Sequence, residues 1–194
     1  MTTTTLPRQL SRQQSEQMPR QQSPELPRQT TLRRLAQYSF LVVGYGNELR
    51  GDDAVGAQVA NTVASWELPA VRSIVVHQLL PELATELATA DYVIFVDACG
   101  EESCARTVQL SPISATQSDR VATALTHAHS AQGLLALTQK LYGHTPQAWL
   151  LQVPTESFDF GKRLSSTALR GSDQAVQTIE RFLINYQVPY PVAL

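Results

Sequence analysis

Three acidic residues follow a glycine-rich turn where the apolar part of the chain begins. In FLVVGYGNELRGDDAVG, residues 40–56, Glu48, Asp52 and Asp53 lie between a G-Y-G turn and a pattern typical of a helix. Asp52 as the helix cap, with Asp53 in the first turn, would favour the helix without any further role. Glycines also let the backbone approach another group closely, and an ionised aspartate is a good ligand for a hard cation. The pair is therefore a candidate for helix capping or for metal binding.

The same stretch fits a nucleotide site poorly. A dinucleotide-binding loop needs a third glycine at the position that Leu49 occupies in this chain. Three carboxylates beside a pyrophosphate would also repel it. A nucleotide-binding module is therefore the weakest of the functions considered.

Two further segments carry side chains that could share a site with the acidic pair. In YVIFVDA, residues 92–98, an apolar run leads straight into Asp97. A buried carboxylate is costly unless it is paired or coordinated, although Asp97 could also cap the next turn. The polar loop THAHSAQGLL, residues 126–135, supplies His127 and His129, and an isolated loop histidine is most often simply exposed. Each of these residues has an ordinary explanation when it is considered alone.

Strand-like and helix-like periods alternate along the chain after residue 37. The predicted strands cover residues 39–45, 71–79, 91–98, 105–110 and 147–154. The predicted helices cover residues 53–67, 81–90, 132–143 and 172–186, the last of them capped by Ser172 or Asp173. This alternation predicts an α/β fold: a five-stranded, mostly parallel, twisted sheet with helices on both faces, forming a three-layer sandwich.

Such a fold would bring the candidate residues together. Ligands of open parallel sheets bind outside the carboxyl ends of the strands. Asp53 follows the first strand, Asp97 follows the third, and a histidine, His127 or His129, precedes the third helix. Two carboxylates and one imidazole are a plausible ligand set for a first-row divalent metal ion. The chain has no G-x-S-x-G, C-x-x-C or H-E-x-x-H motif, so neither a serine nucleophile nor a zinc protease is indicated.

Residues 1–37 differ in composition from the rest of the chain. They are rich in Gln, Arg, Ser, Thr and Pro, and they carry six arginines against two glutamates. We expect this extension to be disordered and residues 38–194 to form the folded domain. The net charge of −2 does not indicate a nucleic acid partner, and no apolar run approaches the length of a membrane span.

The number of cysteines indicates the redox state of the cellular compartment. Cys99 and Cys104 are too few for a disulfide framework, which favours a reducing cytoplasm. Cys99 is then expected to be a small buried side chain.

Taken together, these motifs resemble the maturation proteases of nickel–iron (NiFe) hydrogenases. The first segment has the form G-x-G-N-x-L-x-x-D-D/E-x-x-G, which is specific in combination with the aspartate at the end of the third strand. The resemblance extends from about Ser39 to Ile184 through VVGYGNELRGDDAVG, HQLLPELATELATADYVIFVDA, HAHSAQGLLALTQKLYG and VPTESFDFGKRLS. The stretches HQLLPELA and LTQKLYGHTPQAW look most like the proteases of bidirectional, NAD-linked hydrogenases.

The resemblance implies an aspartyl-type endopeptidase with a five-stranded α/β fold. It would remove a short C-terminal extension from the hydrogenase large-subunit precursor, its partner, once nickel has been delivered there. The metal-sensing and catalytic residues of the family fall on Asp53, Asp97 and His127, with His129 as the alternative to His127. The implied nickel is carried by the precursor and is contacted by the protease, which we expect to be a cytoplasmic monomer.

The roles of these residues in the reaction stay open at the level of sequence. The metal could polarise the scissile carbonyl or activate a water molecule. Alternatively, one aspartate could act as general base while nickel serves only as a positional check on the precursor. Asn47 could orient Asp53 or simply form a turn, and Glu156 and Ser157 are expected to be loop residues on the same edge. A noncatalytic, nickel-dependent assembly scaffold or metallochaperone could use the same three residues and is the alternative function.

Overall fold

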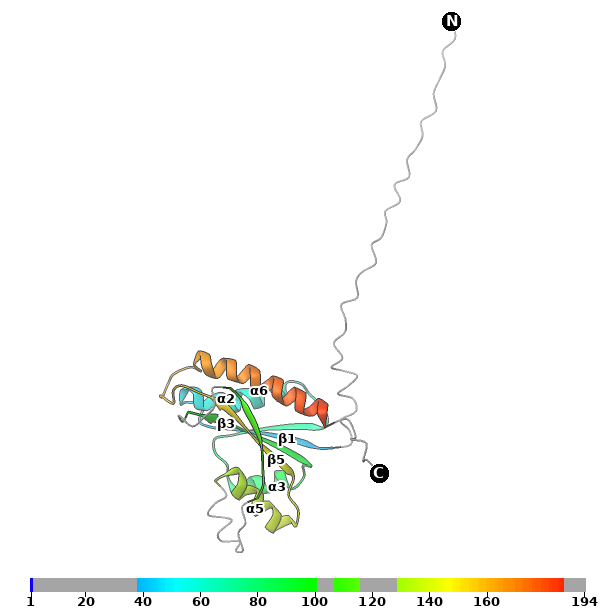
Figure 1. Cartoon of the computed structure of the whole chain (residues 1–194), viewed down its shortest axis with the longest axis vertical. Coiled ribbons are helices and arrows are strands. Elements are labelled where there is room, and N and C mark those ends of the chain that lie inside the picture. Colours follow the sequence, from blue (N-terminus) through cyan, green and yellow to red (C-terminus); the bar gives the residue numbers. More distant parts are fainter. Residues whose placement is uncertain (2–37, 101–106, 116–128, 187–194) are drawn as a thin grey trace.

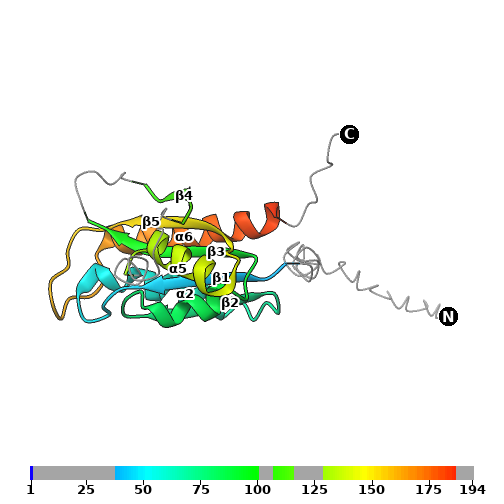
Figure 2. The same ribbon diagram turned by 90° about the horizontal axis from the view of Figure 1, so that it is seen from below.

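A single twisted sheet forms the centre of the protein. The computed structural model describes Met1 and residues 38–100, 107–115 and 129–186. In this part of the chain the sheet consists of β1 (Phe40–Tyr45), β2 (Val71–Val76), β3 (Tyr92–Cys99), β4 (Gln109–Ile113) and β5 (Gln147–Pro154). Their order is β2-β1-β3-β5-β4, with β4 antiparallel to β5 and the other neighbours parallel. Figure 2 shows β4 and β2 at opposite edges of this sheet.

Helices cover both faces of the sheet, as the sequence predicts. The described helical segments are η2 (Gly51–Ala54), α2 (Val55–Ala64), η3 (Pro81–Leu83), α3 (Ala84–Leu87), α5 (Ala131–Tyr142) and α6 (Ser166–Asn185). α2 and α6 lie on one side, and α3 and α5 lie on the other (Figure 1). Each side has its own apolar core, because alternate residues of the buried strands face opposite helix layers. The predicted α/β three-layer sandwich is confirmed. None of the described helices has the length and apolar character that crossing a bilayer requires.

Several elements differ from the prediction. β2 ends at Val76 and not at residue 79, and α3 ends at Leu87 and not at residue 90. The fourth strand was expected at residues 105–110, but β4 occupies Gln109–Ile113 at the open edge of the sheet, where Pro112 is tolerated. The closing helix begins at Ser166, before the expected start at residue 172, and the Ser165 hydroxyl caps it by accepting the Ala168 N–H at 3.1 Å. Gly171 therefore lies inside the helix.

Gly171 has a packing role that the sequence does not reveal. A Cβ at this position would lie 2.6 Å from Cγ1 of Val153, so glycine lets α6 approach β5 closely. The glycine that looks like a helix boundary is thus a contact point between helix and sheet.

The glycines of the first segment serve the same kind of contact. A Cβ on Gly44 would lie 2.0 Å from the carbonyl oxygen of Gly56, and a Cβ on Gly56 would lie 2.7 Å from the carbonyl oxygen of Val96. Helix α2 therefore packs with its backbone directly on β1 and β3. As a result, η2, which precedes α2, is held at the carboxyl ends of these two central strands.

Candidate functional site

Asp52 is a buried structural residue and does not cap the helix. Its side chain is 0% exposed, and η2 and α2 have no side-chain cap. Oδ2 accepts the backbone N–H groups of Glu156 at 2.8 Å and Ser157 at 3.2 Å, and the Ser165 hydroxyl at 2.7 Å. Oδ1 accepts the Ser165 N–H at 2.6 Å. Asp52 therefore ties η2 to the segment between β5 and α6, and the capping interpretation of this residue is wrong.

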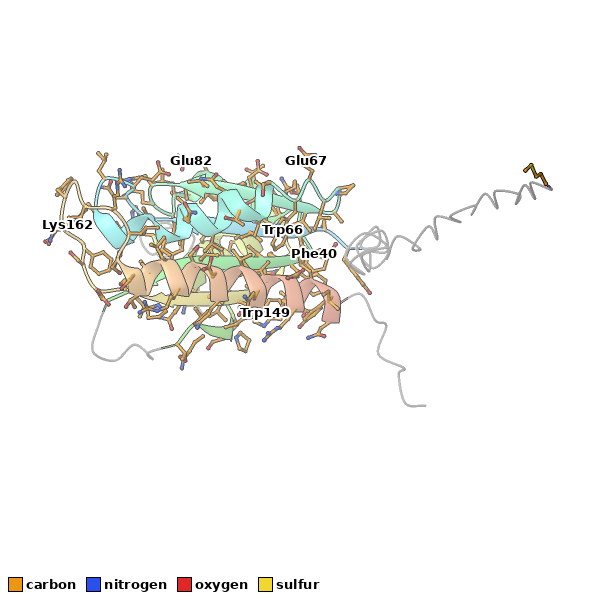
Figure 3. The ribbon with its side chains drawn as sticks, turned by 90° about the horizontal axis from the view of Figure 1, so that it is seen from above. Phe40, Trp66, Glu67, Glu82, Trp149 and Lys162 are labelled. Atoms are coloured by element: carbon orange, nitrogen blue, oxygen red, sulfur yellow. The ribbon has the colours of Figure 1, made fainter. Side chains whose placement is uncertain are left out.

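The environment of Asp52 favours its charged form. Burial opposes ionisation, but the hydrogen bonds from Ser165, Glu156 and Ser157 outweigh it and lower the pKa of Asp52. The segment that Asp52 holds extends past the end of β5. Figure 3 shows Lys162, in this segment, at the end of the molecule opposite Phe40, the first residue of β1.

Asp53 faces the turn that follows β1. Its Oδ2 accepts the Asn47 N–H at 2.9 Å, while the Asn47 side-chain oxygen accepts the Leu49 N–H at 2.9 Å. Gly46 has φ +137°, and a Cβ there would lie 2.0 Å from the Asp53 carbonyl oxygen. Asn47 therefore both forms the turn and orients Asp53 through its backbone, and only glycine fits at position 46.

Asp97 lies at the end of β3 and is partly buried. The hydroxyl of Tyr45, the last residue of β1, faces its carboxylate closely enough to act as a hydrogen-bond donor. Burial, and then the negative charge of Asp97, raise the pKa of Tyr45, so this phenol stays protonated and is the donor. Sequence reasoning missed Tyr45, because the pairing of β1 with β3 that places it beside Asp97 is not visible in the sequence.

The Asp53 and Asp97 carboxylates are close enough for their charges to interact. Burial raises the pKa of Asp97, the Tyr45 hydrogen bond lowers it, the charge of Asp53 raises it, and the Ala98 N–H lowers it, with a net rise. The ion pairs found among the described residues join Arg72 to Glu86 and Lys162 to Asp159, so neither site aspartate has a cationic partner there. Two neighbouring carboxylates without a cation form a negative site at the edge of the sheet.

The histidines are only partly placed. His127 lies outside the described residues, so its proposed role stays a prediction. His129 is exposed and comes just before Ser130, whose hydroxyl caps α5 by accepting the Gly133 N–H at 3.1 Å. His77 falls inside the strand predicted at residues 71–79, but it is exposed and comes just after β2 ends at Val76.

The start of α5 is at the same edge of the sheet as the aspartates. Helix α5 ends at Tyr142, shortly before β5 starts at Gln147, which pairs with the first residue of β3. The opposite end of α5 must therefore lie toward the carboxyl ends of the strands. Within the described ranges no group of three or more His, Cys, Asp and Glu side chains is arranged to hold a metal ion. Two aspartates alone would be an incomplete ligand set.

Cys99 differs from the expectation of a small buried side chain. It is disulfide-bonded and partly buried, and Nε2 of Gln152 lies 3.5 Å from its sulfur. The chain has one other cysteine, Cys104, which lies outside the described residues. A disulfide at Cys99 removes the argument for a reducing compartment that rested on the cysteine count.

Solved structures with this fold were found, with coverage of three quarters of the chain. A "[NiFe] hydrogenase maturation protease HybD" from Thermococcus kodakarensis is 19% identical, with a TM-score of 0.58 over 75% of this chain and 99% of that chain. A "hydrogenase 2 maturation peptidase" from a Thaumarchaeota archaeon is 25% identical, with a TM-score of 0.56 over 75% and 97%. The Escherichia coli "hydrogenase maturating endopeptidase HybD" is 21% identical, with a TM-score of 0.56 over 76% and 93%. The protein thus has the α/β fold of these endopeptidases.

Comparisons of the sequence itself found no match. No protein-family profile matches the chain, and no curated protein matches it. The likeness to the hydrogenase maturation peptidases is therefore a likeness of structure together with the motifs of the first segment and of β3.

Proposed function

We propose that the protein is a hydrogenase maturation endopeptidase. It removes a short C-terminal extension from the large-subunit precursor of a nickel–iron hydrogenase, and its substrate carries the nickel. The observation that carries this proposal is the pair Asp53 and Asp97, two interacting carboxylates without a described cationic partner, at the carboxyl edge of a fold shared with maturation peptidases.

The chemistry of the pair suits recognition of a metal that arrives with the substrate. Carboxylate oxygens are ligands for divalent ions, and an incomplete ligand set leaves positions for donors from the precursor. Contacts made only with the nickel-loaded precursor would distinguish it from the nickel-free form by a difference in affinity. His127 would complete the protease side of this ligand set. Service to a bidirectional, NAD-linked hydrogenase stays a prediction that rests on the sequence motifs.

A cleavage experiment tests this proposal. Nickel-loaded and nickel-free precursor are incubated separately with the protein, and a shortened large subunit is looked for on a gel. Shortening of the nickel-loaded precursor alone supports the proposal. Binding of that precursor without shortening would support the alternative of an assembly scaffold, and affinity for nucleotides with indifference to nickel would contradict both.

Asp53→Ala and Asp97→Ala variants should abolish the shortening. Asp159→Ala is a matched control, because Asp159 is an exposed carboxylate in the loop after β5 and is paired with Lys162. This variant should cleave as the unmodified protein does. Loss of cleavage in all three variants would point to general damage of the protein.

A further inference from the structure

Tyr45 and Asp97 are neighbours on one face of the sheet. Tyr45 lies two residues after Val43 in β1 and packs against the core beneath α3 and α5. Asp97 lies two residues after Phe95 of the same core, so the alternation of side chains along β3 puts it on the same face of the sheet. The parallel register of β1 and β3 places the last residue of β1 beside Asp97. A hydroxyl and a carboxylate thus stand directly above an apolar layer.

The partner of Asp97 in this layer is neutral. A lysine or arginine in the place of Tyr45 would also hold the carboxylate, but it would cancel the negative charge that a metal ion needs. A phenol donates a hydrogen bond and leaves the charge of Asp97 in place.

Asp97 needs such a restraint because of its neighbour. The charge of Asp53 repels the Asp97 carboxylate, and a partly buried side chain at a strand end can turn away from this repulsion. The Tyr45 hydroxyl opposes that movement, since a hydrogen bond to a charged acceptor is among the stronger ones in proteins.

We propose that Tyr45 is a positioning residue that fixes the Asp97 carboxylate for contact with the nickel of the precursor. This inference rests on the proposed endopeptidase function and adds a residue to it. Tyr45 touches neither the metal nor the scissile bond, and it acts through Asp97 alone. Its contribution therefore appears only with the nickel-loaded substrate.

The test compares Tyr45→Phe with Tyr142→Phe. Tyr142 is a suitable control because its hydroxyl is also hydrogen-bonded, to Thr85 at 2.9 Å, and it lies at the far end of α5. Three quantities are measured for each variant: kcat/KM for cleavage of nickel-loaded precursor, Kd for nickel-free precursor, and Tm. For Tyr45→Phe we expect kcat/KM to fall about tenfold or more and Tm to fall slightly, because a hydrogen bond to a charged group is lost, while Kd for nickel-free precursor stays unchanged. Tyr142→Phe should change none of them.

The outcomes separate this inference from the proposed function. Cleavage by Tyr45→Phe at the rate of the unmodified protein would overturn the positioning role and leave the endopeptidase function standing. A parallel loss of cleavage, of affinity for nickel-free precursor and of Tm would show a merely structural role and would also overturn it. An unmodified protein that does not cleave nickel-loaded precursor would overturn the proposed function, and the role of Tyr45 with it.

Discussion

Two adjacent aspartates at the start of η2 have opposite tasks. Asp52 is buried, and its carboxylate is fully occupied by hydrogen bonds from the segment that leads into α6. Asp53 is only partly buried and keeps an oxygen that no described donor engages. Asp52 therefore holds the local structure together, whereas the Asp53 carboxylate has an oxygen that could bind a metal ion.

Replacement of Asp52 by Asn should destabilise the protein. The amide cannot accept all of the N–H and O–H groups that surround this position, and we expect a loss of about 3 kcal/mol in the free energy of unfolding. The control Asp159→Asn removes an exposed ion pair with Lys162 and should leave the free energy of unfolding nearly unchanged. Urea denaturation of both variants measures this difference, and equal losses would contradict the bracing role.

The pH dependence of stability should change with the same variant. Because the folded-state pKa of Asp52 is lowered, its contribution is present above the unfolded-state pKa of about 3.9 and is lost as the pH falls through the folded-state value. The unmodified protein should therefore lose stability in acid more steeply than Asp52→Asn. Urea denaturation between about pH 6 and pH 2 tests this, and parallel curves would contradict it.

Asp97 should show the reverse relation between stability and function. Its folded-state pKa is raised, so its charge destabilises the folded protein above that pKa, and this cost disappears below about pH 4. Asp97→Asn should be about 1 kcal/mol more stable at neutral pH, as is common when a strained functional residue is replaced. The gain should vanish in acid, whereas cleavage should be lost at every pH. A less stable Asp97→Asn at neutral pH would show that the carboxylate is structural.

At the scale of secondary structure, the contact between α2 and the sheet determines where η2 lies. A Cβ on Gly56 would come within 2.4 Å of the Tyr45 carbonyl oxygen and 2.7 Å of the Val96 carbonyl oxygen. These are backbone atoms of two central strands, and they cannot move aside as a flexible side chain can. The distance between Asp53 and Asp97 therefore depends on a glycine in the first turn of α2.

Gly56→Ala should separate α2 from β1 and β3. We expect a loss of about 3 kcal/mol in unfolding free energy from overpacking, together with lost cleavage, although alanine is the better helix former. The control Gly143→Ala has φ +74° but no atom within 4 Å of the new Cβ, so it should cost about 1 kcal/mol and leave cleavage intact. Cleavage by Gly56→Ala at the normal rate would contradict the link between this contact and the site.

The elements differ in how well their sequences specify them. β1, β3 and β5 were predictable to within a residue or so, because strands buried on both faces are continuous apolar runs. β4 is half exposed and carries Pro112, so its pattern is weak. The start of α6 was missed because Gly171 resembles a boundary, and its contact with β5 is not visible in the sequence.

The site was predictable only in part for a related reason. Asp53 comes after a buried strand and Asp97 lies near the end of another, so the rule for parallel sheets places both at one edge. The bonds of Asp52 join residues more than a hundred positions apart, and no local pattern reports them. The bond between Tyr45 and Asp97 depends on the register of β1 and β3, which requires the structure.

At the scale of the molecule, the described domain begins with aromatic contacts. Tyr38 packs against Tyr92 with ring centroids 5.4 Å apart, and β1 starts two residues later. A chain that lacks residues 1–37 should keep its unfolding free energy to within about 1 kcal/mol and should cleave normally. Chemical denaturation and the cleavage assay test this expectation, and a large loss in either would assign a role to the N-terminal extension.

The most direct test of the central claim is the ratio of the cleavage rates of nickel-loaded and nickel-free precursor, followed by the intact mass of the large subunit. For the unmodified protein we expect cleavage of the nickel-loaded form alone, and for Asp97→Asn no cleavage of either form. Equal cleavage of the two forms, or cleavage that persists in Asp97→Asn, would contradict a site in which paired carboxylates read the metal of the substrate.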